Sequence, residues 1–179
     1  MYPKPRYVAS FEPTFTATDE NKVNEIFTAI ADQIKRKNLA KRTVNSHSKV
    51  WTYQKIGNAG FISNAYPLKS ITRYLKNQPV VITNPGPSLQ YDIEAIKKNR
   101  QKIRIVAVAQ SCPALVKNGI SPDFIIVCDP MDYSSVLNDL DTSMTKAFIL
   151  CDTSHENFFT KLPDIPHVVI PGEDSVFRT

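Results

Sequence analysis

The sequence contains little cysteine, little glycine and no long apolar run. Three cysteines and five glycines among 179 residues exclude a disulfide scaffold and a collagen-like chain. The longest apolar runs, 124–128 and 147–151, are far shorter than the roughly 20 residues of a membrane-spanning helix. No apolar segment follows Met1–Arg6, so no secretory signal is visible. These absences predict a cytoplasmic protein without a membrane span, whose cysteines are reduced, buried thiols.

Positive charge is concentrated in one part of the chain. Residues 1–76 hold 13 Lys and Arg against 5 Asp and Glu, a net charge of +8. Residues 77–179 hold 9 against 12, a net charge of −3. The basic character therefore belongs to the first part alone, and the net charge of the whole chain gives no reason to expect a nucleic acid as partner.

The first part, residues 1–76, is predicted to be a basic helical lead-in followed by a connector. Thr18 can cap a helix whose apolar residues recur at helical spacing until a basic run at 35–42. That run is typical of a solvated helix end, and contacts with phosphates of a nucleic acid or lipid are the alternative. A short strand at 50–53, a turn at 57–60 and a short helix at 68–75 are expected in the connector.

The second part, residues 77–179, alternates apolar β-branched runs with segments of helical character. The runs lack in-and-out alternation, which is typical of strands covered on both faces. Together these features predict an α/β fold with a doubly wound, mostly parallel sheet and an N-terminal helical lead-in. The expected strands are 80–83, 103–109, 124–128, 147–151 and 167–170, and the expected helices are about 88–100, 112–119, 133–140 and 155–162.

Ligands of open parallel sheets bind beyond the carboxyl ends of the strands. Gly86 can adopt a left-handed backbone and allows close approach of a ligand. Ser88 can cap the next helix, whose free amides at 88–91 suit a phosphate or carboxylate; a simple capped turn is the alternative. The polar or small residues that follow the strands are Asn84, Gly86, Pro87, Ser88, Gln110, Ser111, Asp129, Asp152, Thr153 and His155.

Two of these residues are candidates for catalysis. Asp129, beside Pro130, offers a carboxylate for a ribose hydroxyl or for Mg²⁺, and the alternative is a helix cap or a partner for a lysine. His155 stands at the same edge, next to Asp152 and Thr153, and a structural histidine is the alternative. The sequence has neither an HxxxH pair for zinc nor a GxSxG nucleophile elbow.

Three segments resemble the motif series of one family: 79–89 (PVVITNPGPSL), 105–109 (IVAVA) and 115–130 (LVKNGISPDFIIVCDP). That family comprises the motility-associated factor (Maf) flagellin-glycosylation proteins and the MptE-like 6-hydroxymethylpterin diphosphokinases. The GPSL turn and the NGI-x-PD…DP segment are its most specific signatures, although Pro85 stands where the family has Gly or Ala. The resemblance covers about residues 65–179 and implies a Rossmann-like nucleotide-binding domain. It places Gly86, Pro87 and Ser88 at a phosphate, and Asp129 at a ribose or metal ion.

The two branches of that family imply different reactions. In the Maf branch, a nonulosonic acid passes from its CMP donor to Ser or Thr of flagellin or another protein acceptor. In the MptE branch, diphosphate passes from ATP to a pterin alcohol with the help of Mg²⁺. The family domain continues past the fifth strand, so the resemblance implies that domain 77–179 is incomplete at its C-terminal side. A non-catalytic nucleotide-binding or interaction module is therefore a third hypothesis.

Overall fold

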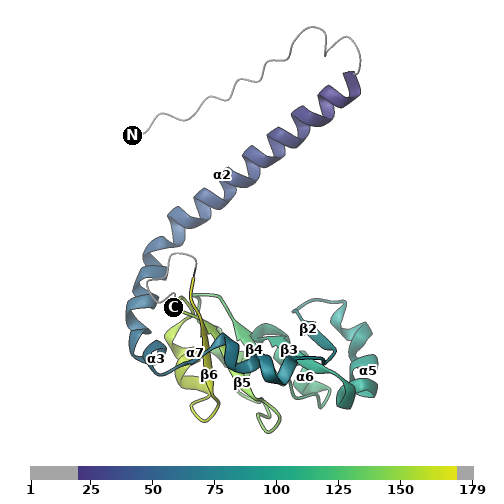
Figure 1. Ribbon diagram of the computed structural model, residues 1–179, viewed down its shortest axis with the longest axis vertical. Helices are drawn as coiled ribbons and strands as arrows, with labels where there is room; N and C mark the ends of the chain where they lie inside the picture. Colours follow the sequence, from purple (N-terminus) through teal and green to yellow (C-terminus); the bar gives the residue numbers. More distant parts are fainter. Residues whose placement is uncertain (1–19, 173–179) are drawn as a thin grey trace. The chain divides into compact units, whose positions relative to one another are not determined.

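The computed structural model describes residues 20–172, and the chain divides into two compact units, Met1–Ser48 and Lys49–Thr179 (Figure 1). The predicted cap at Thr18 lies outside the described residues. In the first unit, the described residues form part of a single long helix, α2 (Glu20–Gly57). Within the described residues, no helix is both long enough and apolar enough to cross a membrane.

Helix α2 is longer than the sequence pattern indicates. It continues through the basic run at 35–42, and the short strand expected at 50–53 is wrong because these residues are helical. Residues 38–56 contain neither proline nor glycine, so nothing in the sequence ends the helix before Gly57. The predicted turn is reduced to Asn58, and α3 (Ala59–Ser63) follows directly.

A six-stranded parallel sheet forms the centre of the second unit, with the order β1-β6-β5-β4-β3-β2. All five predicted strands are present, so the α/β fold with a parallel sheet and a long N-terminal helix is confirmed. Strand β1, which pairs with β6, was not expected because it has only two residues and one of them is proline. The strands are β1 (Tyr66–Pro67), β2 (Val80–Thr83), β3 (Arg104–Val108), β4 (Phe124–Val127), β5 (Ala147–Cys151) and β6 (His167–Ile170).

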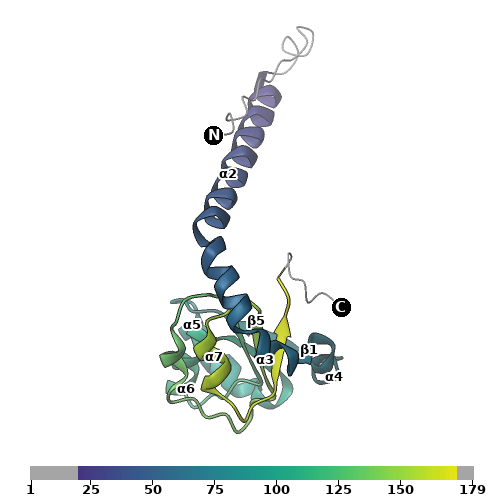
Figure 2. The same cartoon turned by 90° about the vertical axis from the view of Figure 1, so that its left-hand side faces the viewer.

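One face of the sheet carries most of the helical cover. From β2 to β6 each strand lies beside its predecessor in the chain, and the connecting helices lie on one side (Figure 2). Alternate strand residues such as Ile105, Ile125 and Phe148 point into this larger core. The segment expected to be helical at 133–140 forms only a short 3₁₀ turn. The connections contain α5 (Leu89–Asn99), η2 (Arg100–Lys102), η3 (Ala109–Ser111), α6 (Cys112–Lys117), η4 (Ser134–Leu137) and α7 (Glu156–Lys161).

The other face is covered by the short helical segment predicted at 68–75, which forms η1 (Leu68–Ile71) and α4 (Thr72–Leu75). Ile71 packs there with Phe124 and Ile149, and the ring of Tyr74 lies edge-on to Phe124 with the centroids 6.1 Å apart. Residues 49–76, assigned above to the lead-in and connector, thus belong to the same compact unit as the sheet. The pairing and packing partners named here lie about 50 to 100 positions later in the chain, which is why local sequence patterns did not place these residues there.

Candidate functional site

The predicted site residues all follow strands of the parallel sheet, at the carboxyl ends of β2, β3, β4 and β5. These strands are consecutive neighbours, so the four ends lie along one edge. With about 4.8 Å between adjacent strands, the row from β2 to β5 measures roughly 14 Å. The edge is therefore long enough for a ligand of the size of a nucleotide to touch several strand ends at once.

The turn 84–88 is open to solvent along its whole length. Gly86 does not use the left-handed backbone that a glycine permits, because among the described glycines only Gly119 has a positive φ. A Cβ built on Gly86 meets no atom within 4 Å. Gly86 therefore faces open space, which still permits the close approach of a ligand that we expected there.

The start of α5 offers fewer free amides than expected. The N–H of Leu89 donates to the carbonyl of Gly86 at 3.2 Å, and that of Tyr91 donates to the carbonyl of Ser88 at 3.0 Å. Ser88 occupies the N-cap position, but its hydroxyl makes no capping hydrogen bond. The amides of Ser88 and Gln90 and the Ser88 hydroxyl are thus the groups of this turn that remain for a ligand.

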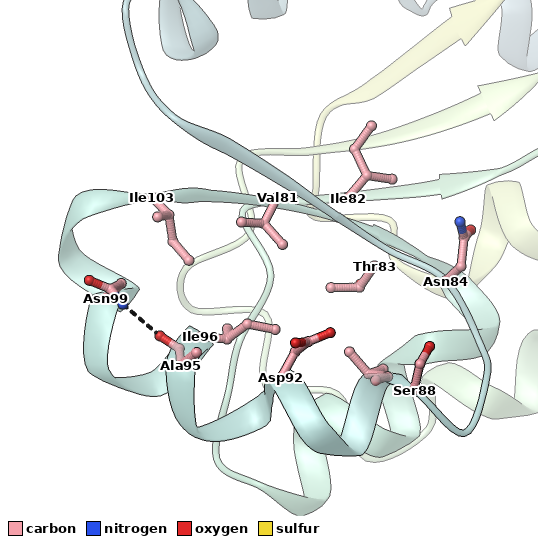
Figure 3. A pocket seen from close by; sticks show the side chains of 11 residues that line it. Val81, Ile82, Thr83, Asn84, Ser88, Asp92, Ala95, Ile96, Asn99 and Ile103 are labelled. Atoms are coloured by element: carbon pink, nitrogen blue, oxygen red, sulfur yellow. Dashed lines mark hydrogen bonds between the residues drawn. The ribbon is translucent and has the colours of Figure 1, made fainter.

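A cavity of about 510 Å³ lies beside this turn, between the edge strand β2 and helix α5 (Figure 3). Its walls combine apolar side chains, such as Val81 and Ile96, with polar ones, and Asp92 projects into the space from the first turn of α5. Sequence reasoning missed Asp92, although an acidic residue one turn after Ser88 was a visible signal. Cavities of this size and character are typical of sites for small organic ligands.

The two candidates at the end of β3 have different surroundings. Gln110 is exposed, whereas Ser111 is buried. The Ser111 hydroxyl lies 2.9 Å from Thr83 Oγ1, 3.1 Å from the Thr83 carbonyl and 2.7 Å from that of Val108. Ser111 therefore fixes the end of β2 to the end of β3, and Gln110 is the candidate beyond β3 that reaches solvent.

Asp129 is half-buried directly beyond β4. One of its carboxylate oxygens, Oδ1, accepts a hydrogen bond from the Met131 N–H at 2.9 Å and so fixes the loop that follows. Among the described residues, the other oxygen has no hydrogen-bond or ion-pair partner. The turn-forming role and a ligand-binding role are thus compatible, because each uses a different oxygen.

His155 occupies the N-cap position of α7, where its Nδ1 accepts a hydrogen bond from the Asn157 N–H at 3.2 Å. Asp132, which sequence reasoning missed, accepts from the Asn157 side chain at 2.6 Å and from the Ser134 N–H at 3.0 Å. The hydrogen bonds from Ser134 and from Asn157 lower the pKa of Asp132. Beyond β4 and β5, the structure thus places one carboxylate of depressed pKa next to the imidazole.

Asp152 is completely buried, in contrast to the open turn at β2. Its Oδ2 accepts from the Gly172 N–H at 3.1 Å and lies 3.8 Å from Lys55 Nζ, while its Oδ1 has no partner among the described residues. The side chain of Asn58, also buried, donates to the carbonyls of Asp152 and Ser154. Lys55 and Asn58 were missed because the sequence interpretation placed them in a connector. Thr153, between these anchored residues, is half-buried.

The three cysteines occupy unlike environments. The expectation that all are buried is wrong for Cys128, which is exposed, whereas Cys151 is half-buried and Cys112 is buried. A hydrogen bond from the Cys151 thiol lowers the pKa of Cys128 to about 7 and raises that of Cys151. Burial raises the pKa of Cys112 to about 12. The carboxyl edge thus carries one acidic thiol with a second thiol as its neighbour.

Metal ligands are sparse in residues 20–172, where no cluster of three or more His, Cys, Asp or Glu side chains could hold an ion. The free oxygen of Asp129 fits Mg²⁺ only as a single ligand, with substrate phosphates and water completing the shell. A metal ion at this edge would therefore have to be held largely by the phosphates of its substrate and by water.

The fold and the polar strand ends together define a parallel α/β domain with a candidate ligand site at the carboxyl edge of its sheet. A family model described as "6-hydroxymethylpterin diphosphokinase MptE-like" matches residues 53–165, and the chain belongs to this family. The chain is also similar to the solved structure of the MAf glycosyltransferase from Magnetospirillum magneticum AMB-1, with 22% identity and a TM-score of 0.43. That similarity covers 52% of this chain and 16% of the other. None of the curated proteins matches the chain.

Proposed function

We propose that this domain is a nucleotide-binding transferase of the Maf type. It would move a nonulosonic acid from a CMP donor to a Ser or Thr hydroxyl of a protein acceptor such as flagellin. The observation that carries the proposal is the open turn 84–88. The space in front of Gly86 is free of protein atoms, and the Ser88 and Gln90 amides and the Ser88 hydroxyl lie at the same turn.

The donor phosphate would lie against this turn. Backbone N–H groups at the start of α5 and the positive end of its dipole favour a negative group there. As the sugar leaves, negative charge grows on the phosphate of CMP, and donors fixed in place stabilise that charge without reorganising. The neighbouring cavity, whose walls combine apolar side chains with Asp92 and other polar groups, would receive the nucleoside.

The proton-transfer roles follow from the hydrogen bonds already made. Because His155 Nδ1 accepts from the Asn157 N–H, the neutral imidazole carries its proton on Nε2. His155 would therefore donate to the phosphate or the leaving group and would not remove a proton. The free oxygen of Asp129 would accept a hydrogen bond from the ribose or from the attacking hydroxyl. Gln110, exposed between these groups, would complete the row of ligand contacts.

A second candidate is the pterin diphosphokinase activity that names the matched family. In that reaction ATP would take the place of the CMP donor, and Asp129 would contribute one ligand to Mg²⁺ held by the transferred phosphates. The single free carboxylate oxygen favours the CMP reaction, since a departing nucleoside monophosphate can be stabilised by N–H donors alone. Binding of a nucleotide without catalysis remains the third candidate.

Calorimetry on the full chain separates the candidates. We expect CMP to bind without Mg²⁺ if the first proposal is correct. Binding of ATP only with Mg²⁺, followed by that of 6-hydroxymethylpterin, would replace it by the second. Nucleotide binding without sugar or diphosphate transfer would support the third, and absence of any binding at millimolar concentration would reject all three.

The variant Gly86→Val tests the position of the site. The added side chain enters open space, so the fold should persist while the approach of a phosphate is blocked. We expect the affinity for the bound nucleotide to fall at least tenfold, about 1.4 kcal/mol. Gly60→Val is the matched control, because a Cβ there also meets nothing within 4 Å and Gly60 lies on α3, away from the strand ends. Equal affinity of both variants would remove the turn from the site.

A further inference from the structure

Cys128 and Cys151 lie at the ends of neighbouring parallel strands. Cys151 is the last residue of β5, and Cys128 directly follows β4. In the register of this pair Val127 lies opposite Leu150, so the next two positions along the strands are Cys128 and Cys151. The two residues, 23 positions apart in the sequence, are thus direct cross-strand neighbours.

The two thiols also share a face of the sheet. The preceding alternate pairs, Phe124 with Ala147 and Ile126 with Ile149, both point into the core below η1 and α4. Side chains return to the same face every second residue, so Cys128 and Cys151 point there together.

The backbone separation suits a covalent bond between the sulfurs. Adjacent strands lie about 4.8 Å apart, and disulfides span Cα–Cα distances of roughly 4.4 to 6.8 Å. A bond can therefore form with little displacement of either strand. The pair also differs in access, since Cys128 is exposed and Cys151 is half-buried.

We propose that Cys128 and Cys151 form a peroxide-reactive dithiol, in which exposed Cys128 is oxidised first and Cys151 then closes an intrachain disulfide. Exposure of the attacking sulfur and a resolving cysteine beside it are the features of redox-sensitive sites. This proposal does not depend on the function proposed above.

The reaction balances with hydrogen peroxide as the oxidant. The Cys128 thiolate attacks one peroxide oxygen, the O–O bond breaks, and the departing hydroxide takes up the Cys128 proton to form water. The Cys151 sulfur then attacks the resulting sulfenic acid, so that an S–S bond forms and the S–O bond breaks. The second hydroxide takes up the Cys151 proton and leaves as water. The two thiols lose two electrons, which reduce one peroxide to two waters.

The disulfide would lie at the edge of the candidate site. Asp129 and Asp152 directly follow the two cysteines, so the bond would hold the ends of β4 and β5 together one residue before each carboxylate. A change in the oxidation state of the two cysteines would therefore occur directly beside Asp129 and Asp152, the carboxylates that would face or support a ligand.

Peptide mapping of the full chain tests the proposal, with Cys112 as an internal control because it is a buried thiol of the same chain. Reduced protein is treated with hydrogen peroxide, the remaining thiols are alkylated, and the peptides are identified by mass spectrometry. We expect a Cys128–Cys151 disulfide within one chain and an alkylated Cys112. Persistent alkylation of Cys128, oxidation of Cys112 at an equal rate, or a disulfide formed only between chains would overturn the proposal.

Three variants assign the roles. In Cys151→Ser a sulfenic acid should persist on Cys128 and be captured by dimedone, whereas Cys128→Ser should lower peroxide consumption at least tenfold. Cys112→Ser should leave disulfide formation unchanged. Dimedone capture at Cys151 in place of Cys128 would reject the assignment. If a variant does not fold, the peptide map of the unmodified sequence still decides whether the disulfide forms.

Discussion

The polar residues at the two edges of the parallel sheet have different roles. At the amino edge, buried Asp123 lies 3.0 Å from Arg100 and 3.7 Å from Arg104, and accepts from the Ile105 N–H at 2.8 Å. At the carboxyl edge, residues 84–88 are exposed, and Asp129 keeps one oxygen without a described partner. The polar groups described at the amino edge are paired within the fold, while several at the carboxyl edge remain available to bind a ligand.

This difference divides the family signature into two parts. In NGI-x-PD…DP, Gly119 has φ of +68° and ends α6, with the Ile120 N–H donating to the Leu115 carbonyl. Asp123 of the same segment joins β3 to β4 at the amino edge. Only Asp129, at the other end of β4, belongs to the candidate site. A signature residue can thus reflect the fold or the ligand, and its edge of the sheet tells which.

The largest effect should come from Asp123→Ala. Removal of the carboxylate leaves the guanidinium of Arg100 and the Ile105 N–H without their buried partner. Loss of one member of a buried ion pair costs about 3 to 5 kcal/mol, so we expect that decrease in the free energy of unfolding. Urea denaturation measures it, with the exposed Asp139→Ala as control. A loss no greater than that of the control would contradict a structural role for this edge.

Asp129→Asn should have the opposite effect, with little change in stability and a loss of ligand affinity. The amide oxygen can still accept from the Met131 N–H, so the free energy of unfolding should change by less than about 0.5 kcal/mol. The charge on the free oxygen is lost, and we expect nucleotide affinity or transfer to fall at least tenfold, about 1.4 kcal/mol. Calorimetry and urea denaturation, compared with Asp139→Asn, check both parts. A loss of stability without a change in affinity would show that Asp129, like Asp123, has a structural role.

The same contrast explains which parts of the fold could be predicted from the sequence. The five longer strands are continuous apolar runs, so local composition identifies them. Strand β1 exists only because Tyr66 and Pro67 pair with β6, more than 100 residues later. At 50–53, β-branched and aromatic residues favoured a strand, but the uninterrupted helix on their N-terminal side overrides that preference.

The candidate site could be predicted as an edge but not as a set of contacts. The position of polar residues after each strand predicts that Asn84, Ser88 and Asp129 lie at the carboxyl edge of the sheet, where the structure has them. It does not reveal that Asp152 is buried, because the groups that enclose it, Lys55 and Asn58, come from α2 and the residue after it. Such contacts between distant parts of the chain leave no periodic trace in the sequence.

At the amino edge, His167 should make stability depend on pH. It begins β6, its Nε2 lies 3.2 Å from the Leu162 carbonyl, and burial lowers its pKa. Between its usual pKa of about 6.5 and the lower folded value, the unfolded chain binds more protons, so stability falls as pH decreases. The slope for one proton is at most about 1.4 kcal/mol per pH unit. His167→Phe should flatten urea-derived stability between about pH 7 and 5.5, and an unchanged slope would contradict this assignment.

The smallest effect on stability should come from Ser88→Ala at the carboxyl edge. A serine that caps a helix with its side chain contributes about 1 kcal/mol, but the Ser88 hydroxyl makes no such bond to α5. We therefore expect the free energy of unfolding to change by less than about 0.5 kcal/mol, while nucleotide affinity falls because a ligand contact is lost. His155→Ala is the comparison, since the His155 side chain does cap α7, and it should cost more stability. If Ser88→Ala were the more destabilising of the two, the open turn would be part of the fold and not of the site.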